Sequence, residues 1–213
     1  MKVRNFKNRI KELIPRSLLV RDLKPEAGNS VLLTFDDGPD EKVTPAVLER
    51  LRVRQAKAVF FVVGRRIGGA SGVLRMIHEE GHSIGNHSFV HSNGSQPWFV
   101  AYYQDILRCQ RLVENAVGIR PRLFRAPLGR LSPTTLIAPR LLGLRTIHWS
   151  LDSGDWQCRT VEQARQAAQS ACAGIRERDI LLMHDDHPFV LDLLDVLLSG
   201  CSSLDLTKGI DFL

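Results

Sequence analysis

The stretch Val31-Leu32-Leu33-Thr34-Phe35-Asp36-Asp37-Gly38-Pro39 decides the fold class of this chain. Its apolar beginning is typical of a buried strand in a parallel sheet, and Gly38 and Pro39 end that strand abruptly. Neighbouring side chains of a strand point to opposite faces, so Asp36 and Asp37 can serve one site only where the chain turns sharply. A solvated turn is the alternative, because Asp, Gly and Pro are all turn formers.

Short apolar runs alternate with helical patterns from Val31 onward. The expected strands are 31–35, 58–63, 82–86, 122–124, 144–150 and 179–183, with a seventh near Leu204–Leu206. The expected helices are 43–56, 71–80, 98–117, 132–142, 160–176 and 188–199. This alternation predicts an α/β fold, a parallel sheet with helices packed outside it. A small or incomplete barrel and a doubly wound open sheet both fit, and both form their sites at the carboxyl ends of the strands.

The composition is that of an ordinary globular protein, with 44% hydrophobic and 24% charged residues among 213. We expect a cytoplasmic protein, because no apolar run approaches the ~18 residues of a membrane span and no signal-peptide core is visible. The four cysteines are widely spaced. This spacing argues against a thiolate metal site and favours free thiols in a reducing compartment, which disfavours disulfides.

The positive charge is concentrated at the amino terminus. Residues 1–24 hold eight Lys or Arg and two acidic residues, which accounts for the whole net charge of +6. Apolar residues recur there at three- to four-residue spacing up to Pro15, the pattern of an amphipathic helix. Such an arm can contact an anionic membrane surface or pack on the domain with its charges in water. Because no basic patch with interleaved aromatics follows it, no nucleic-acid partner is expected.

Chemically active side chains gather where the expected strands end. His87 and His91 follow the third strand, Arg125 follows the fourth, Asp155 follows the fifth, and His184 closes the sixth. Scattered surface residues would not favour one edge of the sheet. The convergence therefore favours a site over a solvated turn.

His87 and His91 are spaced so that both imidazoles can point the same way on one turn. Two histidines and one aspartate, with positions left open, form a catalytic rather than a structural metal site. Zn²⁺ is the expected ion, and Co²⁺ and Ni²⁺ suit the same ligands. Non-haem Fe(II) oxygenases use a similar set, so redox chemistry stays an alternative at this point.

Together these motifs resemble those of the polysaccharide deacetylases, the NodB-homology carbohydrate esterases. The resemblance covers roughly residues 30–200 and includes five motif regions in the order of the family. These are 34–39, 87–91, 125–129, 152–156 and 182–184. It implies a distorted, incomplete (β/α) barrel of about seven parallel strands, so that residues 30–213 form the deacetylase domain and residues 1–29 a basic amphipathic arm.

The resemblance also implies a metal-dependent removal of N-acetyl groups from an N-acetylated glycan. Asp37, His87 and His91 would hold the divalent metal. Asp36 would be the general base, and Arg125 would keep it ionised and oriented.

The remaining roles implied by the resemblance concern the leaving group and the acetyl pocket. His184 would protonate the departing amine, and Asp155 would orient it and raise its pKa. Trp156 and Leu182 would wall the acetyl pocket. A backbone N–H of the loop 125–129 would hold the oxyanion.

The third motif departs from the family pattern of Arg-Pro-Pro-aromatic-Gly. Here it is Arg125-Ala126-Pro127-Leu128-Gly129, so the resemblance implies that Pro127 and Leu128 would contact substrate without an aromatic ring. Substrate choice is therefore open, and a glycan precursor at the inner membrane face fits the basic arm. Hydrolysis of another amide, such as a cyclic imide or ureide, and glycan binding without catalysis are the alternatives. The oligomeric state stays open.

Other polar residues near these motifs are expected to have structural roles. Asp152 is expected to cap a turn, and His187 to cap the last helix or face the solvent. His78, His82 and His148 are not expected to be ligands.

Overall fold

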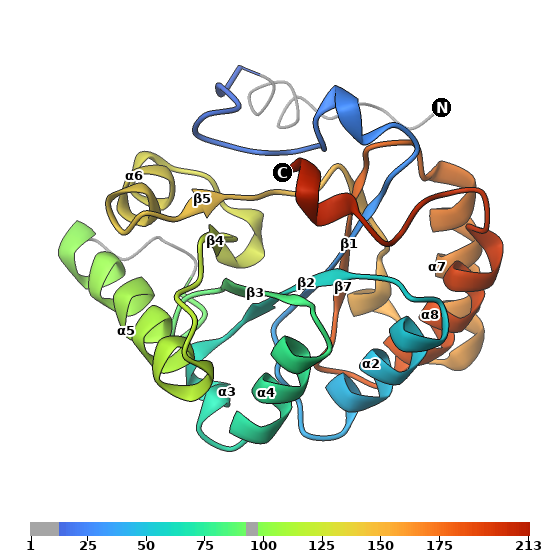
Figure 1. Cartoon of the computed structure of the whole chain (residues 1–213), viewed down its shortest axis with the longest axis horizontal. Helices are drawn as coiled ribbons and strands as arrows, with labels where there is room; N and C mark the ends of the chain where they lie inside the picture. Colours follow the sequence, from blue (N-terminus) through green and yellow to red (C-terminus); the bar gives the residue numbers. More distant parts are fainter. Residues whose placement is uncertain (1–12, 93–97) are drawn as a thin grey trace.

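The computed structural model describes residues 13–92 and 98–213 (Figure 1). Its centre is a sheet of seven parallel strands in the order β5-β4-β3-β2-β1-β7-β6. The strands are β1 Leu32–Asp36, β2 Ala58–Val62, β3 Ser83–Asn86, β4 Leu123–Phe124, β5 Arg145–Thr146, β6 Leu151–Asp152 and β7 Ile180–His184.

The sheet is curled into an incomplete barrel. β5 ends at Thr146 and β6 begins at Leu151, although the two strands lie at opposite edges of the sheet. Five residue steps span at most about 18 Å, whereas the edges of a flat seven-stranded sheet would lie about 29 Å apart. The sheet must therefore curl until its edges approach each other. The expected incomplete barrel is confirmed, in place of the doubly wound open sheet.

Helices surround the outside of the curled sheet (Figure 1). They are α2 Val43–Val53, α3 Gly64–Ile67, α4 Ser71–Glu79, α5 Phe99–Val117, α6 Pro133–Leu141, α7 Val161–Gly174 and α8 Phe189–Gly200. Four short 3₁₀ turns accompany them, η1 Pro25–Ala27, η2 Pro127–Gly129, η3 Asp155–Gln157 and η4 Gly209–Phe212. The six expected helices are all present, and α3 is an additional short one.

Two expectations about strands are wrong. The run 144–150 is not one strand but is divided between β5 and the approach to β6, because the chain must cross from one edge of the sheet to the other. The segment near Leu204–Leu206 is not the seventh strand, since Asp205 forms only an isolated bridge with Ser30. The seventh strand is β6, whose two residues are too short to show an alternating pattern.

Alternation along β1 separates the two faces of the sheet. Leu33 and Phe35 face the helices and belong to the larger hydrophobic core. Leu32 faces the inside of the barrel, in a smaller core that includes Phe61. Asp36 has the same strand parity as Leu32, so it points into the barrel interior.

The amino-terminal segment 13–29 runs from the end of β5 toward the start of β7, at the top of the view in Figure 1. Val20 and Leu23 are buried in the inner core, and the Val20 N–H donates to the Thr146 carbonyl at 2.9 Å. Most of the expected amphipathic helix lies outside the described residues. Leu13, the first residue that the structure describes, is exposed. The boundary at residue 29 stays a prediction. No helix in the described ranges has the length and apolar character needed to cross a membrane.

Candidate active site

A sharp turn brings two adjacent carboxylates to one site. Asp36 ends β1 with its side chain buried, and Asp37 has a φ of 75°, in the left-handed region. A cis peptide bond joins Gly38 and Pro39. Leaving extended geometry at Asp37 removes the alternation that would otherwise send its side chain to the opposite face. The two carboxylates therefore lie near the same histidine, His87.

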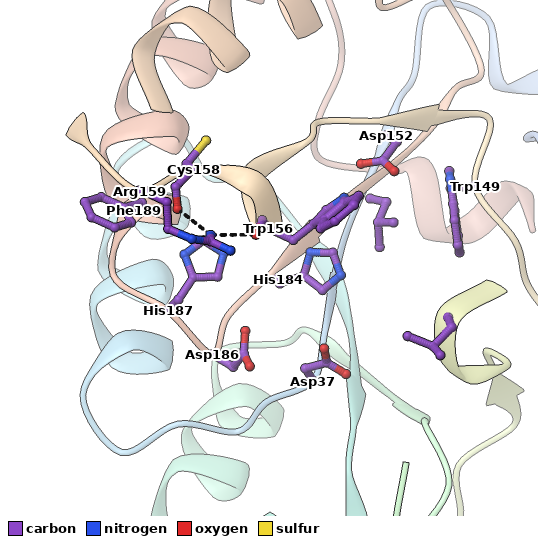
Figure 2. A pocket seen from close by; sticks show the side chains of 12 residues that line it. Asp37, Trp149, Asp152, Trp156, Cys158, Arg159, His184, Asp186, His187 and Phe189 are labelled. Atoms are coloured by element: carbon purple, nitrogen blue, oxygen red, sulfur yellow. Dashed lines mark hydrogen bonds between the residues drawn. The ribbon is translucent and has the colours of Figure 1, made fainter. Parts of the chain in front are cut away.

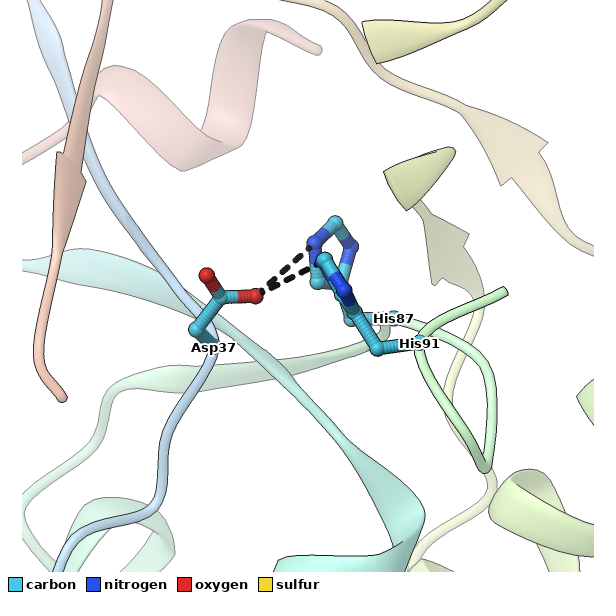
Figure 3. A group of neighbouring side chains, drawn as sticks. All are labelled: Asp37, His87 and His91. Carbon is cyan, nitrogen blue, oxygen red and sulfur yellow. Dashed lines mark ion pairs between the residues drawn. The ribbon is translucent and has the colours of Figure 1, made fainter. Parts of the chain in front are cut away.

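Asp37, His87 and His91 form a cluster at the carboxyl ends of β1 and β3 (Figure 3). Asp37 Oδ1 lies 3.4 Å from His87 Nε2 and 3.0 Å from His91 Nε2. One ligand atom from each residue falls within 4.8 Å of the others. His87 Nδ1 lies 2.8 Å from the Arg125 carbonyl. A carbonyl can only accept, so Nδ1 carries a proton, and Nε2 is the ring nitrogen that faces the cluster.

The cluster suits a divalent cation. Asp37 Oδ1 is buried and lies against the two imidazoles. Burial alone would raise the Asp37 pKa, but hydrogen bonds and charges from His87 and His91 hold it well below its usual range. Burial would lower the pKa of His87, yet the carboxylates of Asp36 and Asp37 raise it. Two imidazoles and an ionised carboxylate are ligands for Zn²⁺ and its first-row neighbours.

Arg125 holds one oxygen of Asp36. Its Nη1 donates to Asp36 Oδ1 at 2.8 Å, and both side chains are buried. The same nitrogen donates to Thr34 Oγ1 at 2.7 Å, and the guanidinium carbon lies 4.2 Å from the centre of the Phe61 ring. Asp36 Oδ2 is turned the other way, 3.7 Å from His87 Nε2. One carboxylate oxygen is thus anchored, while the other faces the cluster of Asp37, His87 and His91.

His184 is paired with a fully buried aspartate. Its Nδ1 lies 2.9 Å from Asp155 Oδ1, and its backbone N–H donates to Asp155 Oδ2 at 2.6 Å. Burial alone would lower the pKa of His184, but the hydrogen bond and charge of Asp155 raise it to about 9. Burial would raise the pKa of Asp155, yet the hydrogen bonds and charge of His184, with His187 3.6 Å away, lower it to about 2. This environment favours a protonated imidazole at neutral pH.

Asp37 and His184 line the same cavity, which has a volume of about 790 Å³ (Figure 2). Leu182, Trp156 and Leu128 form apolar parts of its wall. Trp156 is 50% exposed and Leu128 is 64% exposed, so both are available for contact with a bound molecule.

The loop 125–129 brings only part of its expected residues to the cavity. Pro127 is buried and is not among the residues that line the wall. Leu128 lines it and has a φ of 57°. Gly129 packs against Trp149, whose ring would lie 2.3 Å from any added Cβ. The glycine is therefore needed for the close approach of this loop to the indole.

Sequence analysis missed two residues beside the site. His187 lines the cavity, with Nε2 3.6 Å from Asp155 Oδ2, although it was expected at the surface or as a cap. Asp185 is buried and contacts the turn after β1. The position of Asp185 directly after His184 could have indicated this role. Side chains alternate along a strand, so the side chain of Asp185 points away from the cavity that His184 lines. Asp152 accepts from the Gly154 N–H at 2.8 Å and so caps a turn, as expected.

Comparison with known sequences finds relatives of one kind. The family model described as polysaccharide deacetylase matches residues 24–147. A peptidoglycan-N-acetylglucosamine deacetylase of Listeria monocytogenes is 34% identical over 194 residues, covering 91% of this chain and 40% of that protein. A chitooligosaccharide deacetylase of a Bradyrhizobium species is 34% identical over 179 residues, covering 83% of this chain and 80% of that protein. The chain thus spans about two fifths of the length of the Listeria relative.

Solved structures share the fold. A family 4 carbohydrate esterase from Streptomyces lividans, in complex with acetate, has a TM-score of 0.75 at 28% identity, covering 85% of this chain and 90% of that one. A CE4 family pseudoenzyme from Bacillus anthracis has a TM-score of 0.79 at 23% identity, covering 90% of this chain and 66% of that one. The second likeness concerns the fold alone, so an argument for catalysis must come from the side chains of this chain.

Proposed function

This chain belongs to the polysaccharide deacetylase family, and we propose that it hydrolyses the N-acetyl group of an amino sugar within an oligo- or polysaccharide. The observation that carries the proposal is that Asp37 and His184 line the same cavity. It joins a candidate metal ligand to a histidine paired with a buried carboxylate. A hydrolase of this kind needs a proton acceptor and a proton donor on either side of the scissile amide.

In this proposal, Asp37, His87 and His91 would hold a divalent cation, with Zn²⁺ the ion that suits the ligands best and Co²⁺ or Ni²⁺ as substitutes. When bound there, the cation supplies Lewis-acid polarisation and lowers the pKa of water toward about 7. The second ring nitrogen of His87, held by the Arg125 carbonyl, keeps the imidazole oriented for that role.

Asp36 is the proposed general base. Its Oδ1 is occupied by Arg125, so Oδ2, on the side of the cluster, is the atom that takes the proton of the attacking water. The charged guanidinium of Arg125 holds that carboxylate in place. Asp36 and Asp37 therefore have separate tasks, although they are adjacent in the chain.

His184 is the proposed general acid. Its Nδ1 is bound to Asp155, so Nε2 carries the proton that goes to the departing sugar amine as the C–N bond breaks. The backbone N–H of Leu128 is the proposed donor to the oxyanion, because Leu128 lines the cavity while the Gly129 N–H is engaged with the Ala126 carbonyl. Leu182 and Trp156 would enclose the acetyl methyl group.

A non-catalytic glycan-binding protein is the second candidate, since a pseudoenzyme shares this fold. The pair of His184 and Asp155 argues against it. Pure binding gains little from a buried carboxylate that holds an imidazole protonated, because such a carboxylate is costly to desolvate.

The test is acetate release from N-acetylglucosamine oligomers and from peptidoglycan fragments, with Zn²⁺ or Co²⁺ added to the purified chain. We expect turnover on at least one of these glycans and its loss in Asp36→Asn, which keeps the size of the side chain and removes the base. Glycan binding without acetate release in the wild-type protein would favour the second candidate. Hydrolysis of small cyclic imides or ureides, measured by their disappearance, with no acetate released from any glycan, would favour another amide substrate.

We further propose that residues 1–24 contact an anionic membrane, placing the enzyme at the cytoplasmic face near a glycan precursor. The basic residues of that segment support this idea. Because Val20 and Leu23 are part of the inner core, the test removes only residues 1–12. Co-sedimentation with vesicles containing anionic lipid should fall in the shortened protein, and equal co-sedimentation would overturn the idea.

A further inference from the structure

Asp185 joins the end of β7 to the turn that follows β1. It is 1% exposed, and its Oδ1 accepts from the Gly38 N–H at 3.0 Å. Its Oδ2 accepts from Thr44 Oγ1 at 2.6 Å. The Thr44 oxygen itself accepts from the Asp40 N–H at 2.8 Å, so its hydrogen is free to go to Asp185. Both carboxylate oxygens are therefore occupied by donors from one short segment, residues 38–44.

The packing around this carboxylate leaves little freedom. A Cβ at position 38 would lie 2.2 Å from Asp185 Oδ2, so only glycine allows the approach. The Asp185 N–H also donates to the Asp36 carbonyl at 3.2 Å, which continues the pairing of β1 with β7 past the strand ends. The segment that carries Asp36 and Asp37 is thus held by backbone and side chain of the residue that follows His184.

We propose that Asp185 is a positioning residue, which fixes the turn 36–39 so that the Asp37 carboxylate is held toward His87 and His91 and at a set distance from His184. Asp185 contacts none of the proposed reacting groups with its side chain; it acts through Gly38. Its effect on turnover rests on the proposed function, whereas its effect on the geometry of the turn does not.

The expected effect of removing the Asp185 side chain depends on what the turn 36–39 holds in place, which is a metal ligand and a catalytic carboxylate. Without Asp185 the buried Gly38 N–H would lose its acceptor, and a buried donor without a partner is costly. Loss of a group that orients a metal ligand weakens metal affinity by about 10- to 100-fold. A displacement of about 1 Å at a catalytic group can cost on the order of 100-fold in rate.

The test compares Asp185→Ala with Asp185→Asn in the full chain. Asparagine keeps an oxygen that can accept from the Gly38 N–H, and alanine does not. We expect Asp185→Ala to bind Zn²⁺ about 10- to 100-fold more weakly by calorimetry, with faster hydrogen–deuterium exchange in the peptide around Gly38. Its kcat should fall while KM for the glycan changes little. Asp185→Asn should stay within about threefold of the wild type in Zn²⁺ affinity, since the bond to Gly38 is kept.

The control is Gln110→Leu, which removes a buried hydrogen bond to the Pro121 carbonyl at the opposite end of the strands. This variant separates positioning from general loss of stability. Wild-type Zn²⁺ affinity and exchange in Asp185→Ala would overturn the proposal, as would equal losses in Gln110→Leu at a matched melting temperature. If the wild-type protein deacetylates no glycan, the proposed function fails, while Zn²⁺ affinity and exchange still judge the role of Asp185.

Discussion

Arg125 Nη1 lies 2.8 Å from Asp36 Oδ1, and both charges are buried inside the curled sheet. The guanidinium also donates to Thr34 and, through its Nη2, to the His148 carbonyl at 3.3 Å. The pair is thus part of the barrel interior as well as of the site. Removing one member leaves the other as an uncompensated buried charge, which is more costly than the absence of both.

Arg125→Met should destabilise the protein by about 3–5 kcal/mol, because Asp36 is left buried without its cation. Urea unfolding measures this loss. The double variant Arg125→Met with Asp36→Asn should lose clearly less than the sum of the two single variants, since the charges are in contact. Additive losses would show that the two side chains are not energetically coupled.

The His184–Asp155 pair predicts an alkaline limit to activity. Burial lowers the pKa of His184, but Asp155 raises it to about 9, with smaller contributions from Asp36 and Asp37. A general acid must be protonated, so the rate should fall as pH rises toward 9. A cation bound at Asp37 offsets part of the negative charge of Asp36 and Asp37. The alkaline decline of the pH–rate profile should therefore lie below pH 9. In Asp155→Asn this decline should move further down, toward the ordinary value of 6.5. An unchanged pH profile in this variant would contradict the assignment.

The same pair affects stability with a defined sign. The folded-state pKa of His184 is raised above its ordinary value of 6.5, so the stabilisation is fully present below about pH 6.5 and is lost as pH rises through about 9. Unfolding of metal-free protein by urea at intervals between pH 6.5 and 9.5 should show this decline. Asp155→Asn should show a flatter curve across the same interval.

Metal removal should abolish acetate release and lower the melting temperature. A bound ligand at 100 times its Kd contributes about 2.7 kcal/mol to stability, or roughly 5–10 °C for a chain of this size. Zn²⁺ or Co²⁺ should restore both properties. His91→Ala should require much more metal for the same recovery, because it removes one of the three clustered ligands. His78→Ala, at an exposed histidine of α4, is the matched control and should behave as wild type.

Leu128 is the position where an aromatic ring should alter substrate binding. Its side chain lines the cavity and is 64% exposed, so a larger residue has room. Leu128→Tyr should lower KM for long oligomers by about two- to tenfold, if a ring stacked on a sugar contributes as much as a pair of aromatic rings does, about 0.5–1.5 kcal/mol. The kcat should change little. Leu128→Met, which keeps an aliphatic chain, is the control, and an equal change in KM there would exclude stacking as the cause.

The residues that gather at the candidate site could largely be predicted from the sequence because their side chains follow strand ends. In a parallel sheet the carboxyl ends of all strands meet at one edge. The position of a motif after a strand therefore brings Asp37, His87 and His184 to one end of the barrel before any contact is known. The periodicity that marks helices and strands is equally local, and the six expected helices are present for that reason.

Contacts between side chains from different strands required the tertiary structure. The split of 144–150 follows from the curl of the sheet, which no local pattern records. Pro127 is buried and does not line the cavity, while His187 does.

Asp185 shows the same limit most clearly, since its acceptor role depends on the register of β7 against β1 and on a glycine in another segment. By itself the sequence determined which chemical groups stand at each strand end. Which of them touch was decided only in the folded chain, because strand parity, register and curvature act together over residues far apart in the chain.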